Sequence, residues 1–196
     1  MKRDGFKYFY RLAVRVMNFY TKIDAEILSA KNMTGIDCKY GCGICCEKES
    51  IEAAPLEFFP LAVDIFYKNQ IDLYSNLLEN NKDNVCIFYN KNACSKGLCS
   101  NYEYRGLICR LFGFSTLINK YNAPRLVACD MIKQTDNYKK IQIDDKNLVF
   151  PSMSESYSQF YDISPNDCNV KYPINVAIKK AIDKMLFTFS FNKRVS

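Results

Sequence analysis

The feature that most constrains this chain is a run of four cysteines within nine positions, in the segment DCKYGCGICC. These are Cys38, Cys42, Cys45 and Cys46. Glycines interrupt the run, so we expect an irregular, turn-rich loop rather than a helix or a strand. Thiolates two to four residues apart on a turn can bind one metal ion while backbone N–H groups support the sulfurs. The segment therefore points to a metal site, a redox motif or a disulfide framework.

A disulfide framework is disfavoured. A chain of 196 residues can bury a core of its own and does not need cross-links for it. Arg11, Arg15 and Lys22 interrupt the apolar N-terminal stretch, so we predict no export signal, and no run approaches the ~20 apolar residues of a membrane span. We expect a cytoplasmic protein with reduced thiols. Adjacent cysteines pair badly with each other, and we expect the side chains of Cys45 and Cys46 to point apart, with Cys46 directed into a second centre or into the core.

Composition excludes several kinds of catalysis. The chain has no histidine, which rules out a Ser/His/Asp triad, a Cys–His dyad and the HExxH type of zinc site. The net charge of +6 comes from basic residues spread along the chain. Two four-thiolate zinc sites would offset about four of these charges, so we expect no nucleic acid partner.

Apolar periodicity predicts helices at both ends of the chain, over residues 6–30 and 173–188. Pro60 bends or restarts a helix that continues from Leu61 to Asn80, a short helix is expected over 104–112, and 116–119 pairs with 125–128 in a hairpin. We predict a mainly α or α+β fold, in one small domain over residues 1–196. Two cysteine-rich irregular loops are expected to converge on a metal centre.

The partners of the first cysteines must come from elsewhere in the chain. The candidates are Cys86, Cys94, Cys99, Cys109, Cys129 and Cys168. Three of these six bracket the segment CIFYNKNACSKGLCSNYEYRGLIC, namely Cys86, Cys99 and Cys109. Sulfur ligands suit zinc or an iron–sulfur cluster and disfavour magnesium or calcium. Spacing alone leaves open which metal binds, and whether there are one or two centres.

The two blocks together resemble the CxxCxxCC, or YkgJ-like, cysteine-cluster family of zinc- or iron-chelating domains. Residues 42–46 fit the C-G-x-C-C block, Pro55-Leu56-Glu57 fits the acidic helix start, 86–89 fits a C-x-F-L element, and 99–110 fits C-x-I-Y-E-x-R-P-x-x-C-R. The resemblance covers about residues 36–130. Flagellin lysine N-methylases are longer members of this group, so the resemblance leaves a metal-dependent methyltransferase open beside a metal-binding module.

The resemblance also implies site residues. The metal ligands it suggests are Cys38, Cys42, Cys45, Cys46, Cys86, Cys99, Cys109 and Cys129. Arg105 and Arg110 would offset the thiolate charge and donate hydrogen bonds to the sulfurs. The chain departs from the pattern at a C-x3-C first gap and at Gly106, which stands where the family has proline. Cys94 and Cys168 have no counterpart, and we expect Cys168 in the core.

Two further motif interpretations compete. The spacing of Cys38, Cys42 and Cys45 is that of radical S-adenosylmethionine enzymes, which would bring S-adenosylmethionine as a cofactor. Alternating strands and helices and a Gly-Gly-Glu segment are missing, which disfavours this hypothesis. Cys42-Gly-Ile-Cys45 also has the thioredoxin spacing, but no buried strand precedes it. The sequence identifies neither a substrate nor a protein partner.

Overall fold

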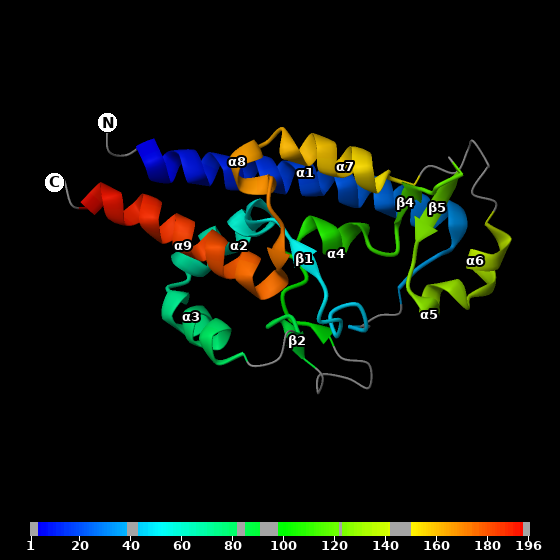
Figure 1. Cartoon of the computed structure of the whole chain (residues 1–196), viewed down its shortest axis with the longest axis horizontal. Helices are drawn as coiled ribbons and strands as arrows, with labels where there is room; N and C mark the ends of the chain where they lie inside the picture. The colour runs from blue at the N-terminus through cyan, green and yellow to red at the C-terminus, as the bar shows by residue number, and fades with distance from the viewer. Residues whose placement is uncertain are drawn as a thin grey trace.

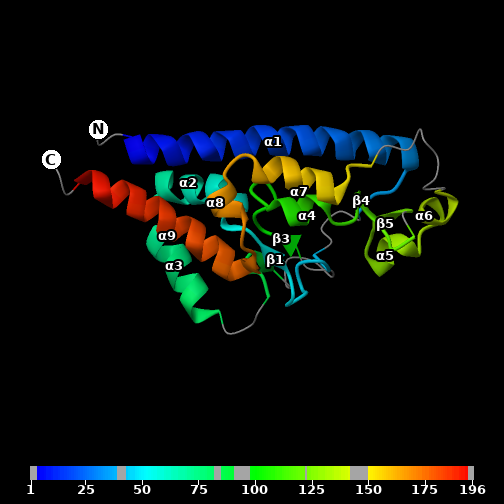
Figure 2. The same ribbon diagram turned by 45° about the horizontal axis from the view of Figure 1, so that its top comes forward.

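The computed structural model describes residues 4–38, 43–81, 85–90, 98–121, 123–141 and 150–193. Helices dominate this part of the chain, and three two-stranded antiparallel sheets connect them. The longest helix, α1 (Asp4–Thr34), runs along the whole length of the molecule, and both chain ends lie at the same end of it (Figure 1, Figure 2). The predicted class, mainly α or α+β in one small domain, agrees with this architecture.

The core forms where α1, α2 (Phe59–Tyr67) and α9 (Ile174–Lys193) pack together. One face of α1 is buried at three- and four-residue steps, as the sequence predicts, and the predicted face of α9 is buried as well. Phe9 of α1 stacks on Phe59 of α2 with ring centroids 4.3 Å apart. Gly35, with φ 65°, ends α1 by donating its N–H to the Lys31 carbonyl at 2.8 Å. Both terminal helices are longer than the predicted ranges.

The expected continuous helix from Leu61 to Asn80 is interrupted. The short 3-10 helix η1 (Pro55–Phe58) leads into α2, and α3 (Ile71–Asn80) is a separate helix. Between α2 and α3, Asn69 takes a left-handed φ of 54°. The N–H of Gln70 bonds the Ile65 carbonyl at 2.9 Å, and that of Asn69 bonds the Phe66 carbonyl at 3.1 Å. This is a Schellman ending, which asparagine tolerates almost as glycine does.

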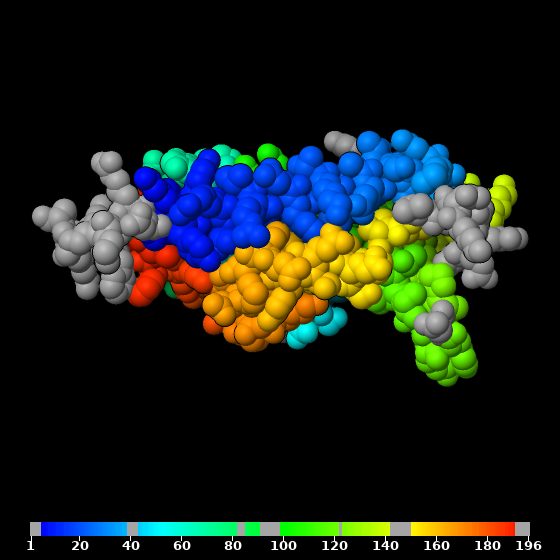
Figure 3. All heavy atoms as spheres, turned by 90° about the horizontal axis from the view of Figure 1, so that it is seen from above, coloured from blue at the N-terminus to red at the C-terminus, as the bar shows by residue number. Residues whose placement is uncertain are grey.

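The three sheets are small and hold the connections in place. β1 (Glu52–Ala53) pairs with β6 (Tyr172–Pro173), and β2 (Tyr89–Asn90) pairs with β3 (Leu98–Cys99). The predicted hairpin is present as β4 (Ser115–Ile118) and β5 (Pro124–Val127), and it stands away from the body (Figure 3). Residues 87–88 after Cys86 form a turn, and strand pairing begins at Tyr89.

Short helices fill the remaining surface. They are α4 (Leu107–Leu111), α5 (Asp130–Lys133), α6 (Asp136–Lys140), α7 (Met153–Tyr161) and α8 (Pro165–Cys168). The sequence predicts the helical turn of α4 but not the others, because each is too short for apolar periodicity to show. Helix α7 packs along α1 and places Phe160 against Tyr20 (Figure 2). Among the described residues, none of the helices is both long and apolar enough to cross a membrane.

Candidate metal centre

The first cysteine loop leads into a tight turn. Residues 44–47 form this turn, closed by the Cys46 N–H bonding the Gly43 carbonyl at 2.8 Å. Cys46 is buried and Cys45 is half-buried. The loop precedes β1, whose pairing with β6 ties it to the start of α9. Glycine at position 43 therefore sits at the turn that the sequence predicts, and the turn presents two neighbouring thiols.

The second cysteine-rich segment is anchored by α9 and by the β2–β3 pair. Asn175 of α9 accepts a hydrogen bond from the Ile87 N–H at 3.0 Å and donates one to the Val85 carbonyl at 2.8 Å. Cys86 is thereby held in a buried turn. Cys99 lies opposite Tyr89 in the sheet register. Asn175 could not be recognised from the sequence, because it lies about ninety residues from the turn that it anchors.

Three thiols from these two segments interact directly. A hydrogen bond with the Cys46 thiol lowers the pKa of Cys45 to about 7 and, in the same way, the pKa of Cys99 to about 7. The same two hydrogen bonds, together with burial, raise the pKa of Cys46 far above its ordinary value. Cys46 is buried, and its direction relative to Cys45 stays a prediction. Cys46 lies between two thiols that favour the ionised form, which is the form that binds metals.

Cys86 and Cys109 complete what we call the five-cysteine group, with Cys45, Cys46 and Cys99. Burial raises the pKa of Cys86 to about 11, and interaction with Cys99 and Cys45 adds to the rise. The pKa of Cys109, on α4, is raised by burial first and then by Cys86, with further effects from Glu57, Cys45 and Cys99. Burial and the charge of neighbouring thiols thus favour the neutral forms of Cys86 and Cys109 until a cation compensates that charge.

The two candidate arginines play different parts. Arg105 lies close enough to lower the pKa values of Cys45 and Cys99, and its guanidinium stacks over Tyr102 at 4.0 Å. Its Nε is buried and has no hydrogen-bond partner among the described residues. Arg110 is directed elsewhere: it is 4% exposed, lies 4.3 Å from the Tyr20 ring centroid and pairs with Asp24 of α1.

Arg110 holds the loop before α4. Its Nε donates to the Arg105 carbonyl at 3.2 Å, and its Nη2 donates to the Glu103 carbonyl at 2.5 Å. The guanidinium therefore clamps residues 103–105 against α1. It supports the shape of the cysteine loop through the backbone, rather than by contact with a sulfur.

The remaining predicted cysteines fall in other places. Cys38 follows α1, where its N–H bonds the Asp37 carboxylate at 2.8 Å, and Cys129 occupies the N-cap position of α5 without a capping hydrogen bond from its side chain. Their roles as ligands stay predictions. Cys42 and Cys94 lie outside the described residues. Cys168 is buried at the end of α8, as expected for a core residue.

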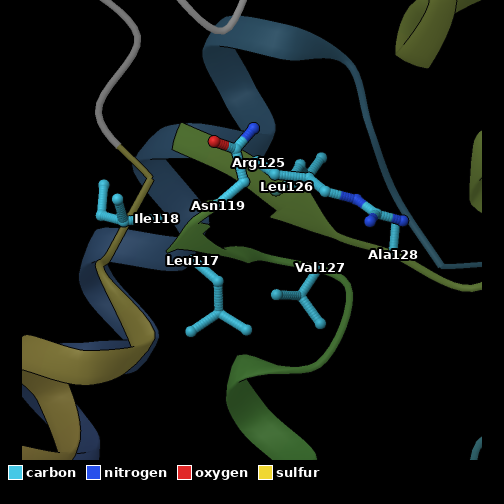
Figure 4. Close-up of a pocket in the computed structure, with 7 residues that line it drawn as sticks. All are labelled: Leu117, Ile118, Asn119, Arg125, Leu126, Val127 and Ala128. Carbon is cyan, nitrogen blue, oxygen red and sulfur yellow. The ribbon is translucent and has the colours of Figure 1, made fainter. Parts of the chain in front are cut away.

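Two cavities help to place the candidate centre. A small one of about 50 Å³ opens beside the cysteines and is lined by Cys45, Cys46, Lys48, Ile51, Ile108, Cys109 and Phe112. A larger one, of about 320 Å³, lies on the β4–β5 hairpin, where Leu117 and Val127 project to the same side (Figure 4). The hairpin cavity has no sulfur in its wall. Only the smaller cavity combines thiols with apolar walls.

The donor set fits zinc or iron in its chemistry. Each member of the five-cysteine group is a free thiol, and these five interact with one another. Over the part of the chain that the structure describes, no three Cys, Asp or Glu side chains are arranged closely enough to enclose a metal ion. The five-cysteine group therefore supplies soft donors but no formed coordination shell, and convergence of the two cysteine-rich loops on a metal stays a prediction.

One buried acid was not recognised as part of the site. Glu57 fits the acidic helix start of the motif, but the sequence says nothing of its environment. In the structure its side chain is completely buried and accepts a hydrogen bond from the first turn of α4. A Pro-x-Glu sequence ahead of a helix is a capping signal, and this signal alone would have placed Glu57 at the helix start.

Comparison with known proteins agrees with this chemistry. Residues 37–168 match the model of the CxxCxxCC family, which is described as "Putative zinc- or iron-chelating domain". Neither the curated proteins nor the solved structures include a significant match. The matched range spans every member of the five-cysteine group, and it extends past Cys129 to Cys168. It also covers more than half of the chain, and the protein is therefore a member of the CxxCxxCC family.

Proposed function

We propose that this protein binds zinc or iron through cysteine thiolates supplied by both cysteine-rich segments. The proposed ligands come from the five-cysteine group together with Cys42. The observation that carries the proposal is that Cys45 and Cys46 of the first segment line one cavity with Cys109 of the second. The interactions of Cys46 with Cys45 and Cys99, which raise the pKa of Cys46, support it. Sulfurs from separate segments meet in this way when they share a metal ion.

The electrostatic surroundings favour the same function. Arg105 stabilises the charged forms of Cys45 and Cys99, and its unpartnered buried Nε is available to donate to a sulfur. The thiols of Cys86 and Cys109 are disfavoured as isolated thiolates, so a divalent cation or a cluster would be needed to ionise them. Both metals stay candidates, because zinc and iron–sulfur clusters accept the same ligands. A structural, delivery or redox role is compatible with either metal.

We also propose a reducing compartment, the cytoplasm, as the place of action. The thiols of the five-cysteine group are free, which is the state that metal ligation requires. In an oxidising compartment, neighbouring thiols such as Cys46 and Cys99 would be at risk of forming disulfides and losing the metal.

Protection of individual cysteines from alkylation tests the proposal. The zinc-free, reduced chain is alkylated with and without added Zn²⁺, and each modified cysteine is identified by mass spectrometry. We expect zinc to protect Cys45, Cys46, Cys86, Cys99 and Cys109, while Cys168 reacts equally with and without the metal. Equal alkylation of all six in both conditions, with Fe²⁺ giving the same result, would refute the proposal.

A further inference from the structure

Glu57 is a buried carboxylate placed between the core and the loop that carries Cys109. Its exposure is 0%, although it lies in the short helix η1 at the start of the helical core. A carboxylate in such a place is costly unless its oxygens are satisfied. The groups that bind the Glu57 oxygens therefore indicate which segments this side chain holds in place.

Its two oxygens bind different parts of the chain. Oε1 accepts a hydrogen bond from the Ala54 N–H at 2.9 Å, which fixes the start of its own helix. Oε2 accepts one from the Ile108 N–H at 3.0 Å, which fixes the first turn of α4, one residue before Cys109. Tyr157 donates a weaker, longer bond to Oε1 at 3.4 Å. One side chain thus connects η1 with the cysteine-bearing helix.

The backbone of Glu57 is held as well. Its carbonyl accepts the Tyr20 hydroxyl at 2.9 Å, and the Tyr20 ring lies under the Arg110 guanidinium. Arg110 clamps the carbonyls of residues 103 and 105, while Glu57 binds the N–H of residue 108. The loop before Cys109 is therefore fixed from two sides, once through carbonyls and once through an N–H group.

Gly106 has no side chain, which lets the start of α4 lie close to the Glu57 carboxylate. A Cβ at position 106 would lie 2.8 Å from Oε2 of Glu57 and 3.1 Å from the Phe58 ring. The φ of Gly106, −64°, is one that any residue adopts, so contact with the carboxylate is the constraint rather than backbone strain. Glycine at this position lets the carboxylate reach the first turn of α4.

From these contacts we propose that Glu57 is a positioning residue for the metal centre, which sets the place of Cys109 through the backbone of α4. This inference rests on the proposed metal-binding function. Groups that orient metal ligands from behind are typically worth about 10–100-fold in metal affinity. Loss of the Glu57 carboxylate should therefore lower the affinity for the metal, with a smaller effect on the free energy of unfolding.

The test compares Glu57→Gln with Asp167→Asn in the full-length, zinc-free chain. Gln keeps the size of Glu57 but brings an NH2 group to one of the two N–H donors. Asp167 is also a buried carboxylate, but its partners are Ser164 and Lys184, outside the cysteine segments. Zinc affinity is measured by competition with a chromophoric chelator, and thermal unfolding gives the loss of stability of each variant. Gly106→Ala displaces the same carboxylate from the other side.

We expect Glu57→Gln and Gly106→Ala to bind zinc about 10-fold or more weakly than the wild type, with Asp167→Asn within about 3-fold. Alkylation of Cys109 in the zinc-free protein should also accelerate in the two site variants. Wild-type affinity in Glu57→Gln, or an equal loss in Asp167→Asn, would overturn the positioning role. A wild type that binds no metal refutes the proposed function instead. In that case unchanged Cys109 alkylation in Glu57→Gln overturns this inference, and accelerated alkylation supports it.

Discussion

Replacing Arg110 by alanine removes the clamp that holds the cysteine loop against α1. The variant loses two hydrogen bonds to the carbonyls of residues 103 and 105, the pair with Asp24 and the contact with the Tyr20 ring. Each carbonyl bond is worth about 1 kcal/mol net, because water can reach this loop in the variant. The ring contact and the buried stem add about 1 kcal/mol each.

These contributions sum to about 3–4 kcal/mol of unfolding free energy. Asp24 adds little, because its side chain is 43% exposed and its charge can be hydrated once Arg110 is gone. With an m-value of about 2 kcal/mol per M for urea, the unfolding midpoint should fall by roughly 1.5–2 M.

The assay is urea unfolding of the metal-free chain, followed by circular dichroism. The matched control is Arg15→Ala, which removes an exposed arginine that donates to the Ile163 carbonyl at 3.0 Å. The control should lose no more than about 1 kcal/mol. If the unfolding free energy of Arg110→Ala stays within about 1 kcal/mol of the wild type, or if the control loses as much, Arg110 does not stabilise the loop as argued.

Three further predictions concern the fold. Gly113 has a φ of 93°, so Gly113→Ala should cost about 1–3 kcal/mol by urea unfolding, since a side chain is strained there. Phe9→Ala leaves the Phe59 ring without its partner and should cost about 3–5 kcal/mol in the same assay. Burial raises the pKa of Cys168 to about 11, from an ordinary value near 9. The folded state therefore keeps this thiol protonated more firmly than the unfolded state does. The stability that this gives is complete below pH 9 and is lost as the pH rises from about 9 to 11. Cys168→Ala should remove that alkaline loss, about 2–3 kcal/mol, in unfolding curves at several pH values; the same slope in both proteins would contradict the pKa rise.

Long periodic segments were predictable because burial of one face dictates them. The buried residues of α1 recur along a single face, as do those of α9, and both faces can be read from the sequence. The break at Asn69 was not predictable in the same way. A single residue took the left-handed conformation that glycine usually takes, and no proline or glycine marked the site.

The chemistry of the site was easier to predict than its geometry. Cysteine spacing indicates sulfur ligation, since few other functions need so many thiols so close together. It does not show that Cys46 lies between Cys45 and Cys99, because that contact joins segments distant in sequence. The role of Arg110 was also hidden. Both arginines pair with Asp24 of α1, but Arg110 also binds the carbonyls of residues 103 and 105, and only the folded structure reveals this difference.

The most direct test of the central claim is the metal content of the chain purified without oxygen. Elemental analysis for zinc, iron and acid-labile sulfide is combined with an absorption spectrum and titration of the thiols. We expect stoichiometric zinc in a colourless protein, or iron and sulfide in a brown one, with the five-cysteine group resistant to thiol reagents in either case. A colourless protein that holds neither metal, and in which Cys45, Cys46, Cys86, Cys99 and Cys109 all titrate freely, would contradict the account.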